Sequence, residues 1–150
     1  MAEEAGRIEL ISFEIAGQEF CLDVAAVREI RGWTPAMPLP HAPEHILGVI
    51  NLRGVVTPVM DLRCRLGLGV TEPSSRNVII VVEENGQTAG LLVDSVRETF
   101  QLSTSLLQAP PTIATDRDER LVDAMIPIES RMLSRLVVAA LLPRDAAIAA

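Results

Sequence analysis

The stretch ILGVINLRGVVTPVMDLRCRLGL, residues 46–68, decides the fold. Two runs of β-branched and other apolar residues, 46–52 and 55–60, flank Arg53-Gly54, and this arrangement predicts a β-hairpin. Both runs are apolar on both faces, so we expect the two strands to lie deep inside a closed sheet or barrel. Pro58 has no backbone N–H to donate, which predicts a sheet edge or a bulge there. Arg53 is a lone guanidinium at the tip of this apolar hairpin.

The segments before and after this hairpin also predict short strands. Asn85-Gly86, between the apolar runs 77–82 and 87–94, is the strongest hairpin signal in the chain. In total, about nine or ten short strands follow one another at a spacing of roughly 8–12 residues, which indicates a barrel or a sandwich. The segment 67–76 is the most linker-like part of the chain interior and divides the pattern into two halves.

Two short helices are predicted from apolar spacing and capping residues. Asp23 has the character of an N-cap, and Val24, Val27 and Ile30 follow at helical spacing, so we expect a short helix that ends at Gly32. A second helix, of little more than one turn, is expected between the N-cap Asp61 and residue 67.

Composition excludes several classes of function. The 150 residues carry a net charge of −7, and all thirteen basic residues are arginine, so nucleic acid and anionic membranes are poor partners and lysine-dependent catalysis is absent. The longest apolar run, 136–142, is far shorter than the ~20 residues that span a bilayer. Without a recognisable signal peptide, the chain is expected in the cytoplasm, with Cys21 and Cys64 as reduced structural thiols.

No residue pattern predicts catalysis, a metal site or a cofactor. His41 and His45 have an i, i+4 spacing, but Pro40 and Pro43 oppose the helix that would place them on one face. Judged on residue type alone, Glu29 and Arg53 are as well explained as solvated surface groups, and Val27 and Val78 as core residues.

A family resemblance gives these four residues a second interpretation. EIRG at 29–32, NLRG at 51–54 and PVMDLR at 58–63 resemble the CheW family of chemotaxis coupling proteins, and the similarity can be followed from about Ile11 to about Pro143. The resemblance implies an all-β fold of two five-stranded SH3-like barrels that share elements, with short helices. It implies a single CheW-like domain over 1–150, with approximate lobes at 16–66 and 77–138 and with the N-terminal strand and the C-terminal segment contributing across the lobes.

The same resemblance implies a non-catalytic scaffold that couples transmembrane chemoreceptors to a histidine kinase. Its partners would be the regulatory domain of the kinase and the cytoplasmic tip of the receptors, with one kinase-facing surface on each barrel and a receptor-facing groove between them. The matching partner-binding residues are Val27, Glu29, Arg53 and Val78. The chain would work in the cytoplasm, at membrane-associated receptor arrays that it reaches through its partners, without nucleic acid, membrane insertion, cofactor or metal.

Two alternatives stay open at this point. One is a CheW-like adaptor of another chemosensory or motility array, and the other is a small-ligand-binding β-barrel, for which one Trp, three Phe and no Tyr are poor material. The C-terminal third departs from the family pattern at Ala124, Ser130, Arg135 and Ala139. Arg135, on an otherwise apolar strand, should reach solvent or a carboxylate.

Overall fold

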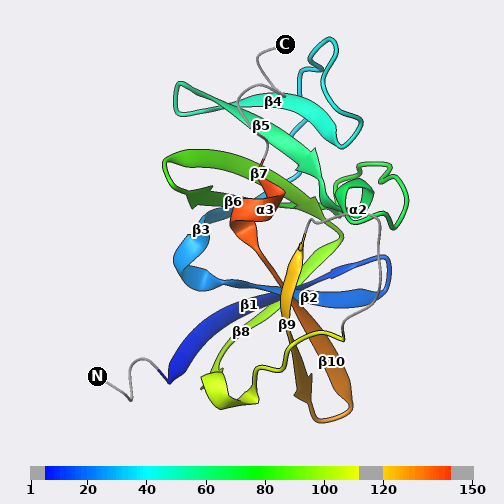
Figure 1. Ribbon diagram of the computed structural model, residues 1–150. Coiled ribbons are helices and arrows are strands. Elements are labelled where there is room, and N and C mark those ends of the chain that lie inside the picture. Colours follow the sequence, from blue (N-terminus) through cyan, green and yellow to red (C-terminus); the bar gives the residue numbers. More distant parts are fainter. Residues whose placement is uncertain (1–5, 112–119, 143–150) are drawn as a thin grey trace.

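Two five-stranded sheets, one above the other in Figure 1, make up most of the computed structural model, which describes residues 6–111 and 120–142. The lower sheet has the order β8-β1-β2-β10-β9, built from β1 (Arg7–Ile15), β2 (Gln18–Asp23), β8 (Ser95–Ser103), β9 (Val122–Ile128) and β10 (Arg131–Leu136). The upper sheet has the order β3-β6-β7-β5-β4, built from β3 (Val27–Gly32), β4 (Ile46–Leu52), β5 (Val55–Asp61), β6 (Val78–Glu84) and β7 (Gln87–Val93). Four short helical segments connect or cover these strands: η1 (Val24–Ala26), α2 (Leu62–Arg65), η2 (Thr104–Leu106) and α3 (Val138–Leu141).

The predicted all-β architecture of two five-stranded, SH3-like barrels with short helices is confirmed. The strands are divided between the sheets differently from the predicted lobes 16–66 and 77–138, because β2 joins β8–β10 while β6 and β7 join β3–β5. The division depends on two short parallel pairings, β2 with β10 and β5 with β7, which join distant segments and leave no local turn signal. That residues 1–150 form a single domain stays a prediction.

A shared hydrophobic core lies between the two sheets. Strands β1 and β2 of the lower sheet contribute to it, as do β4–β7 of the upper sheet and the C-terminal helix α3. Each sheet also has a smaller core of its own. Strands with both faces buried serve two cores at once: in β6, Ile80 and Val82 enter the shared core while Ile79 and Val81 enter the core of the upper sheet. Because both faces of such strands are buried, their sequences are unbroken runs of apolar residues.

The central hairpin is present as β4 and β5. We expected both strands to lie deep inside the sheet, but the tip of the hairpin is exposed. Val55 and Val56 are 57% and 74% exposed, because β4 is the edge strand and the hairpin extends beyond the rest of the sheet. Strand β5 pairs with β7 only over Val59–Asp61. Pro58 therefore stands where one side of β5 has no neighbouring strand, which confirms the predicted edge.

The helix predicted to run from Val24 to Gly32 is wrong beyond its first turn. Asp23 caps η1 as expected by accepting a hydrogen bond from the Ala25 N–H, but from Val27 onward the chain is the strand β3, paired with β6. The burial of β3 alternates with a period of two, as in a strand. A register shift between Val27 and Glu29 pairs them with Val82 and Val81, so Val27 faces the shared core while Glu29 faces the other side of the sheet. Tertiary pairing with β6 has overridden an ambiguous local pattern.

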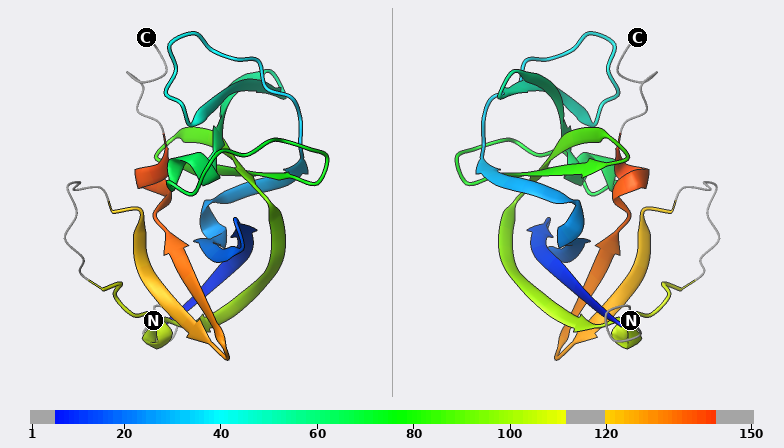
Figure 2. Two further views of the ribbon diagram at one scale, coloured as in Figure 1. Left: turned by 90° about the vertical axis from the view of Figure 1, so that its right-hand side faces the viewer. Right: turned by 90° about the vertical axis from the view of Figure 1, so that its left-hand side faces the viewer.

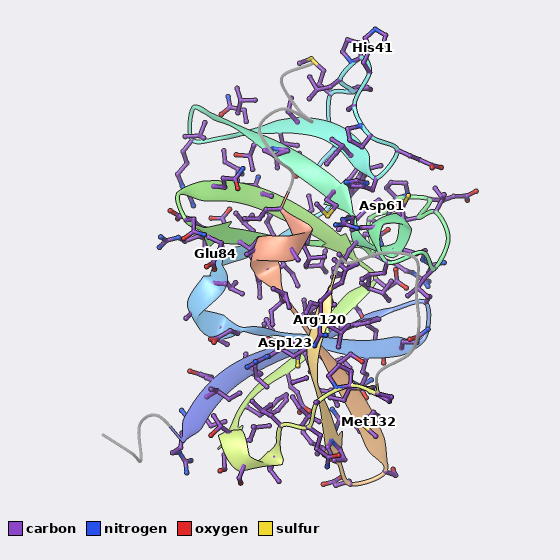
Figure 3. The ribbon with its side chains drawn as sticks, in the orientation of Figure 1. His41, Asp61, Glu84, Arg120, Asp123 and Met132 are labelled. Atoms are coloured by element: carbon purple, nitrogen blue, oxygen red, sulfur yellow. The ribbon has the colours of Figure 1, made fainter. Side chains whose placement is uncertain are left out.

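Asp61 precedes α2 as predicted, but its side chain makes no capping hydrogen bond. The carboxylate is buried and accepts two hydrogen bonds from Thr71, one from the backbone N–H at 2.8 Å and one from the hydroxyl at 2.6 Å. Asp61 therefore ties the 67–77 segment to the upper sheet, beside α2 (Figure 3). A buried carboxylate satisfied in this way is a structural group.

The C-terminal strands contain an arginine that is paired as expected. Arg135 donates to both carboxylate oxygens of Asp123 at 2.9 and 3.0 Å, across the β9–β10 ladder in the lower sheet.

Both cysteines are free thiols. Burial raises the pKa of Cys21 to about 12, so that thiol stays protonated and unreactive at neutral pH.

Gly48 offers a test of how the edge of the upper sheet is covered. Its φ of 148° is rarely adopted by other residues, and an added Cβ would lie 2.1 Å from the carbonyl oxygen of Met37, which bridges to Val49. We expect Gly48→Ala to lower the free energy of unfolding by more than about 2 kcal/mol in denaturant melts. Gly32→Ala is the control, because nothing lies within 4 Å of its added Cβ. Equal midpoints for the two variants would show that the Met37 backbone does not lie against Gly48.

Arg135→Leu tests whether the Arg135–Asp123 pair stabilises the fold. The two side chains are 22% and 38% exposed, so the pair is worth little to the fold, while leucine would bury additional apolar area. We expect the variant to be neutral, or more stable by up to roughly 1–2 kcal/mol, in denaturant melts. A loss above about 2 kcal/mol would show that Arg135 is an essential member of a larger network.

Candidate functional site

The NLRG motif forms the turn between β4 and β5, and each of its residues has a separate task. The side-chain oxygen of Asn51 accepts a hydrogen bond from the Gly54 N–H at 2.6 Å, and Leu52 is buried in the core of the upper sheet. Arg53 and Gly54 have φ values of 51° and 85°, the two positive values that a type I′ turn requires. The turn therefore anchors the hairpin through Leu52 and directs the side chain of Arg53 outward.

Arg53 reaches across from the hairpin to Glu29 on β3. Its Nη2 donates to Oε1 of Glu29 at 2.5 Å, and Nη1 of Arg31 donates to Oε2 at 3.2 Å. Glu29 thus lies between two guanidinium groups. The Arg53 side chain is 78% exposed and that of Glu29 is 22% exposed, so the carboxylate is fixed while most of Arg53 faces solvent.

The hydrogen bond from Arg53, helped by the one from Arg31, lowers the pKa of Glu29 below its usual value. The carboxylate therefore stays ionised to a lower pH than an ordinary glutamate does. Because an exposed pair contributes little to stability, this arrangement mainly fixes the position of charge on the surface.

A groove of about 310 Å³ lies beside this ion pair at the open side of the upper sheet. Charged, aliphatic and hydroxyl side chains from β3, β5, β6, β7 and the end of β4 line it: Arg28, Glu29, Leu52, Arg53, Val55, Thr57, Val81 and Thr88. None of these residues is aromatic. Val55 carries the apolar part of this surface to the hairpin tip, where its strand neighbour Val56 is exposed on the opposite face.

Val27 and Val78 do not join Glu29 and Arg53 at the groove. In the β3–β6 ladder, Val27 pairs with Val82 at one end and Val78 with Gly32 at the other. Both valines are half-buried and pack against the shared core. The structure thus brings together two of the four predicted residues, and the partner-binding role of all four stays a prediction.

Sequence reasoning missed several members of this site. Arg31 is a second partner of Glu29. Residues two apart on a strand share a face, so this pairing could be predicted only if β3 was recognised as a strand. Val55 and Val56 were assigned to the interior, although their place directly after the turn was a signal that they lie at the hairpin tip.

Among the described residues, 6–111 and 120–142, no three His, Cys, Asp or Glu side chains form a group that could hold a metal ion. His41 is not among the residues that line the groove and lies at the outer tip of the connection between β3 and β4 (Figure 3). Over the same residues, no helix has the length and apolar character needed to cross a membrane.

Known proteins with a similar sequence or structure share one family. The CheW-like domain family matches residues 9–146 of this chain. The chemotaxis protein CheW of Rhizobium meliloti is 45% identical over 140 residues, covering 93% of this chain and 90% of that protein. The probable chemotaxis protein CheW of Rhizobium etli is 43% identical, covering 91% and 88%.

A solved structure agrees with these sequence relatives. The crystal structure of the scaffolding protein TtCheW from Thermoanaerobacter tengcongensis superimposes with a TM-score of 0.82 and 31% identity, covering 92% of this chain and 94% of that one. The family match and the relatives both extend over nearly all of the described strands. The chain therefore belongs to the CheW-like domain family and is a non-catalytic chemotaxis scaffold.

Proposed function

We propose that this scaffold couples transmembrane chemoreceptors to a histidine kinase through protein–protein contacts alone. Its partners are the cytoplasmic tip of the receptors and the regulatory domain of the kinase, and it acts in the cytoplasm at receptor arrays. Each barrel presents one kinase-facing surface, and the receptor lies in a groove between the barrels. Val27, Glu29, Arg53 and Val78 belong to the partner-binding region, with Glu29 and Arg53 as its charged centre.

The observation that carries this proposal is the exposed guanidinium of Arg53 held by Glu29 beside an apolar hairpin tip. Exposed β-branched side chains supply contact area, while a charge fixed in position sets partner choice and register. The planar guanidinium of Arg53 has donors beyond the one that contacts Glu29, so it can also bind a carboxylate of a partner.

A small-ligand-binding barrel is a weaker alternative. Such sites are enclosed and commonly lined by aromatic side chains, whereas the groove beside Arg53 is lined by aliphatic, hydroxyl and charged groups. An adaptor of another chemosensory or motility array would use the same surface, and capture of partners from the native host would separate it from the main proposal.

Arg53→Ala is the most direct test of the proposed surface. We expect the variant to stay folded, because an exposed pair is worth only ~0–1 kcal/mol to the fold. A charge that a partner covers has a larger effect on binding. Co-sedimentation with receptor-containing membranes and kinase should therefore weaken tenfold or more, a loss of roughly 1.4 kcal/mol. Kinase activity in the sedimented complex should fall in parallel.

Two further variants sharpen this experiment. Arg53→Lys should recover only part of the assembly, since lysine lacks the planar fork of donors. Arg76→Ala is the matched control, because it removes an exposed arginine from the 67–77 segment, outside the groove. Unimpaired assembly by Arg53→Ala would reduce Arg53 to a solvated turn residue and leave Glu29 without a role in binding.

The ion pair itself can be tested without any partner. Arg53→Ala removes the main cause of the low pKa of Glu29, so that pKa should rise toward the usual value of 4.5. Because the pKa is lowered in the folded state, the stability that it contributes is present above the unfolded pKa and is lost as the pH falls through the folded one. A carbon-13 NMR titration of the Glu29 carboxyl group measures the change. An identical pKa in both proteins would show that Arg53 does not hold Glu29 in solution.

A further inference from the structure

Asp94 is the single residue between β7 of the upper sheet and β8, which lies at one edge of the lower sheet. β7 ends at Val93 and β8 begins at Ser95, so the chain passes from one sheet to the other at this position. Its backbone N–H donates to the carbonyl oxygen of Glu14 in β1 at 3.0 Å. The main chain of Asp94 is therefore already attached to the lower sheet.

The carboxylate of Asp94 joins groups from both sides of this crossing. Its Oδ2 accepts the backbone N–H of Ala16 at 2.9 Å and Nη2 of Arg63 at 3.0 Å. Ala16 belongs to the turn between β1 and β2 of the lower sheet, while Arg63 belongs to α2, which follows β5 of the upper sheet. One oxygen atom thus holds a lower-sheet turn and an upper-sheet helix together.

Arg63 extends from a rigid base. Its neighbour Leu62 is fully buried in the shared core, and Asp61, at the start of α2, is buried and hydrogen-bonded to Thr71. On the same helix, Arg65 donates to the carbonyl oxygen of Ala140 in α3 at 3.1 Å. Helix α2 therefore contacts both the β7–β8 crossing and the C-terminal helix, which lies next to it in both views of Figure 2.

The shared core between the sheets does not by itself define their relative angle. Hydrophobic burial is non-directional and resists separation of the sheets more than a small rotation of one against the other. Hydrogen bonds depend on direction, and the two to Asp94 are both close to ideal length. Because Asp94 is attached to the lower sheet, the bond from Arg63 is the one that a rotation about the β7–β8 crossing would break, while the bond from Ala16 holds the carboxylate in place for it.

We propose that Arg63 and Asp94 are positioning residues that hold the two sheets at one fixed angle. In doing so they set the relative placement of the partner surfaces on the two barrels, a consequence that rests on the proposed function. The PVMDLR motif then has two structural tasks: Asp61 fixes α2, and Arg63 uses α2 to fix the crossing.

Residual dipolar couplings of backbone amides measure this angle directly in the partner-free protein. In the wild type, one alignment tensor should fit the amides of both sheets. In Asp94→Ala, each sheet should still fit its own tensor, but the two tensors should differ in orientation or in degree of order. Asp94→Asn keeps an acceptor for Ala16 and loses the charge that holds Arg63, so it should give a smaller difference.

Glu14→Gln is the matched control. Glu14 pairs with Arg97 inside the lower sheet, and its side chain is 34% exposed against 32% for Asp94, so the variant removes a similar charge without touching the contact between the sheets. It should keep a single tensor. If Asp94→Ala and Asp94→Asn also keep a single tensor with the wild-type orientation, the proposal is overturned.

Assembly with receptor membranes and kinase separates this proposal from the proposed function. If the sheets reorient, Asp94→Ala should also assemble at least about fivefold more weakly than Glu14→Gln, the lower end of typical coupling between sites. Reorientation with unchanged assembly, in a system where Arg53→Ala does lose assembly, would overturn the positioning role. If Arg53→Ala also assembles normally, the proposed surface fails, while the tensors still decide whether Arg63 and Asp94 fix the angle.

Discussion

The shared core between the two sheets is the constraint on which the rest of the structure depends. Eighteen buried residues from both sheets, η1, α2 and α3 meet there. Each sheet has only a small core of its own, so separating the sheets would expose most of the buried apolar surface at a cost of roughly 25 cal/mol per Å². The two barrels therefore stabilise each other, and the polar contacts at their junction act on a pair that is already held together.

Local signals in the sequence predicted the hairpins, because each depends on a few residues at a turn. Asn85-Gly86 and Arg53-Gly54 both adopt the positive φ values that their composition indicates. The distribution of strands between the sheets could not be predicted in this way, since it depends on pairings such as Ser134 with Phe20, which are far apart in sequence. For β3, the spacing of Val24, Val27 and Ile30 fits a helix as well as a strand, and only the pairing with β6 decides.

The sequence motifs identified the important residues of the candidate site and of α2, but they did not always predict the role of each residue. Arg53 and Glu29 were assigned together from the family resemblance, and the structure joins them by a hydrogen bond. The role of Asp61 was predicted as a helix cap, because an aspartate before a short helix usually has that role. The partner of its side chain is Thr71, which lies beyond the helix in a segment with no regular structure, and no local pattern predicts such a contact.

The order in which the strands emerge during synthesis has a consequence for folding. The upper sheet is complete once Val93 has been made, because β3–β7 are consecutive in the chain. In the lower sheet, β1 and β2 are made first, but β2 lacks its neighbour β10 until Leu136. Domains fold as their chains leave the ribosome, so β2 keeps an open edge through most of translation. Pairings between distant segments are in general the slower ones to form, so we expect the β2–β10 pairing to be a late step of folding.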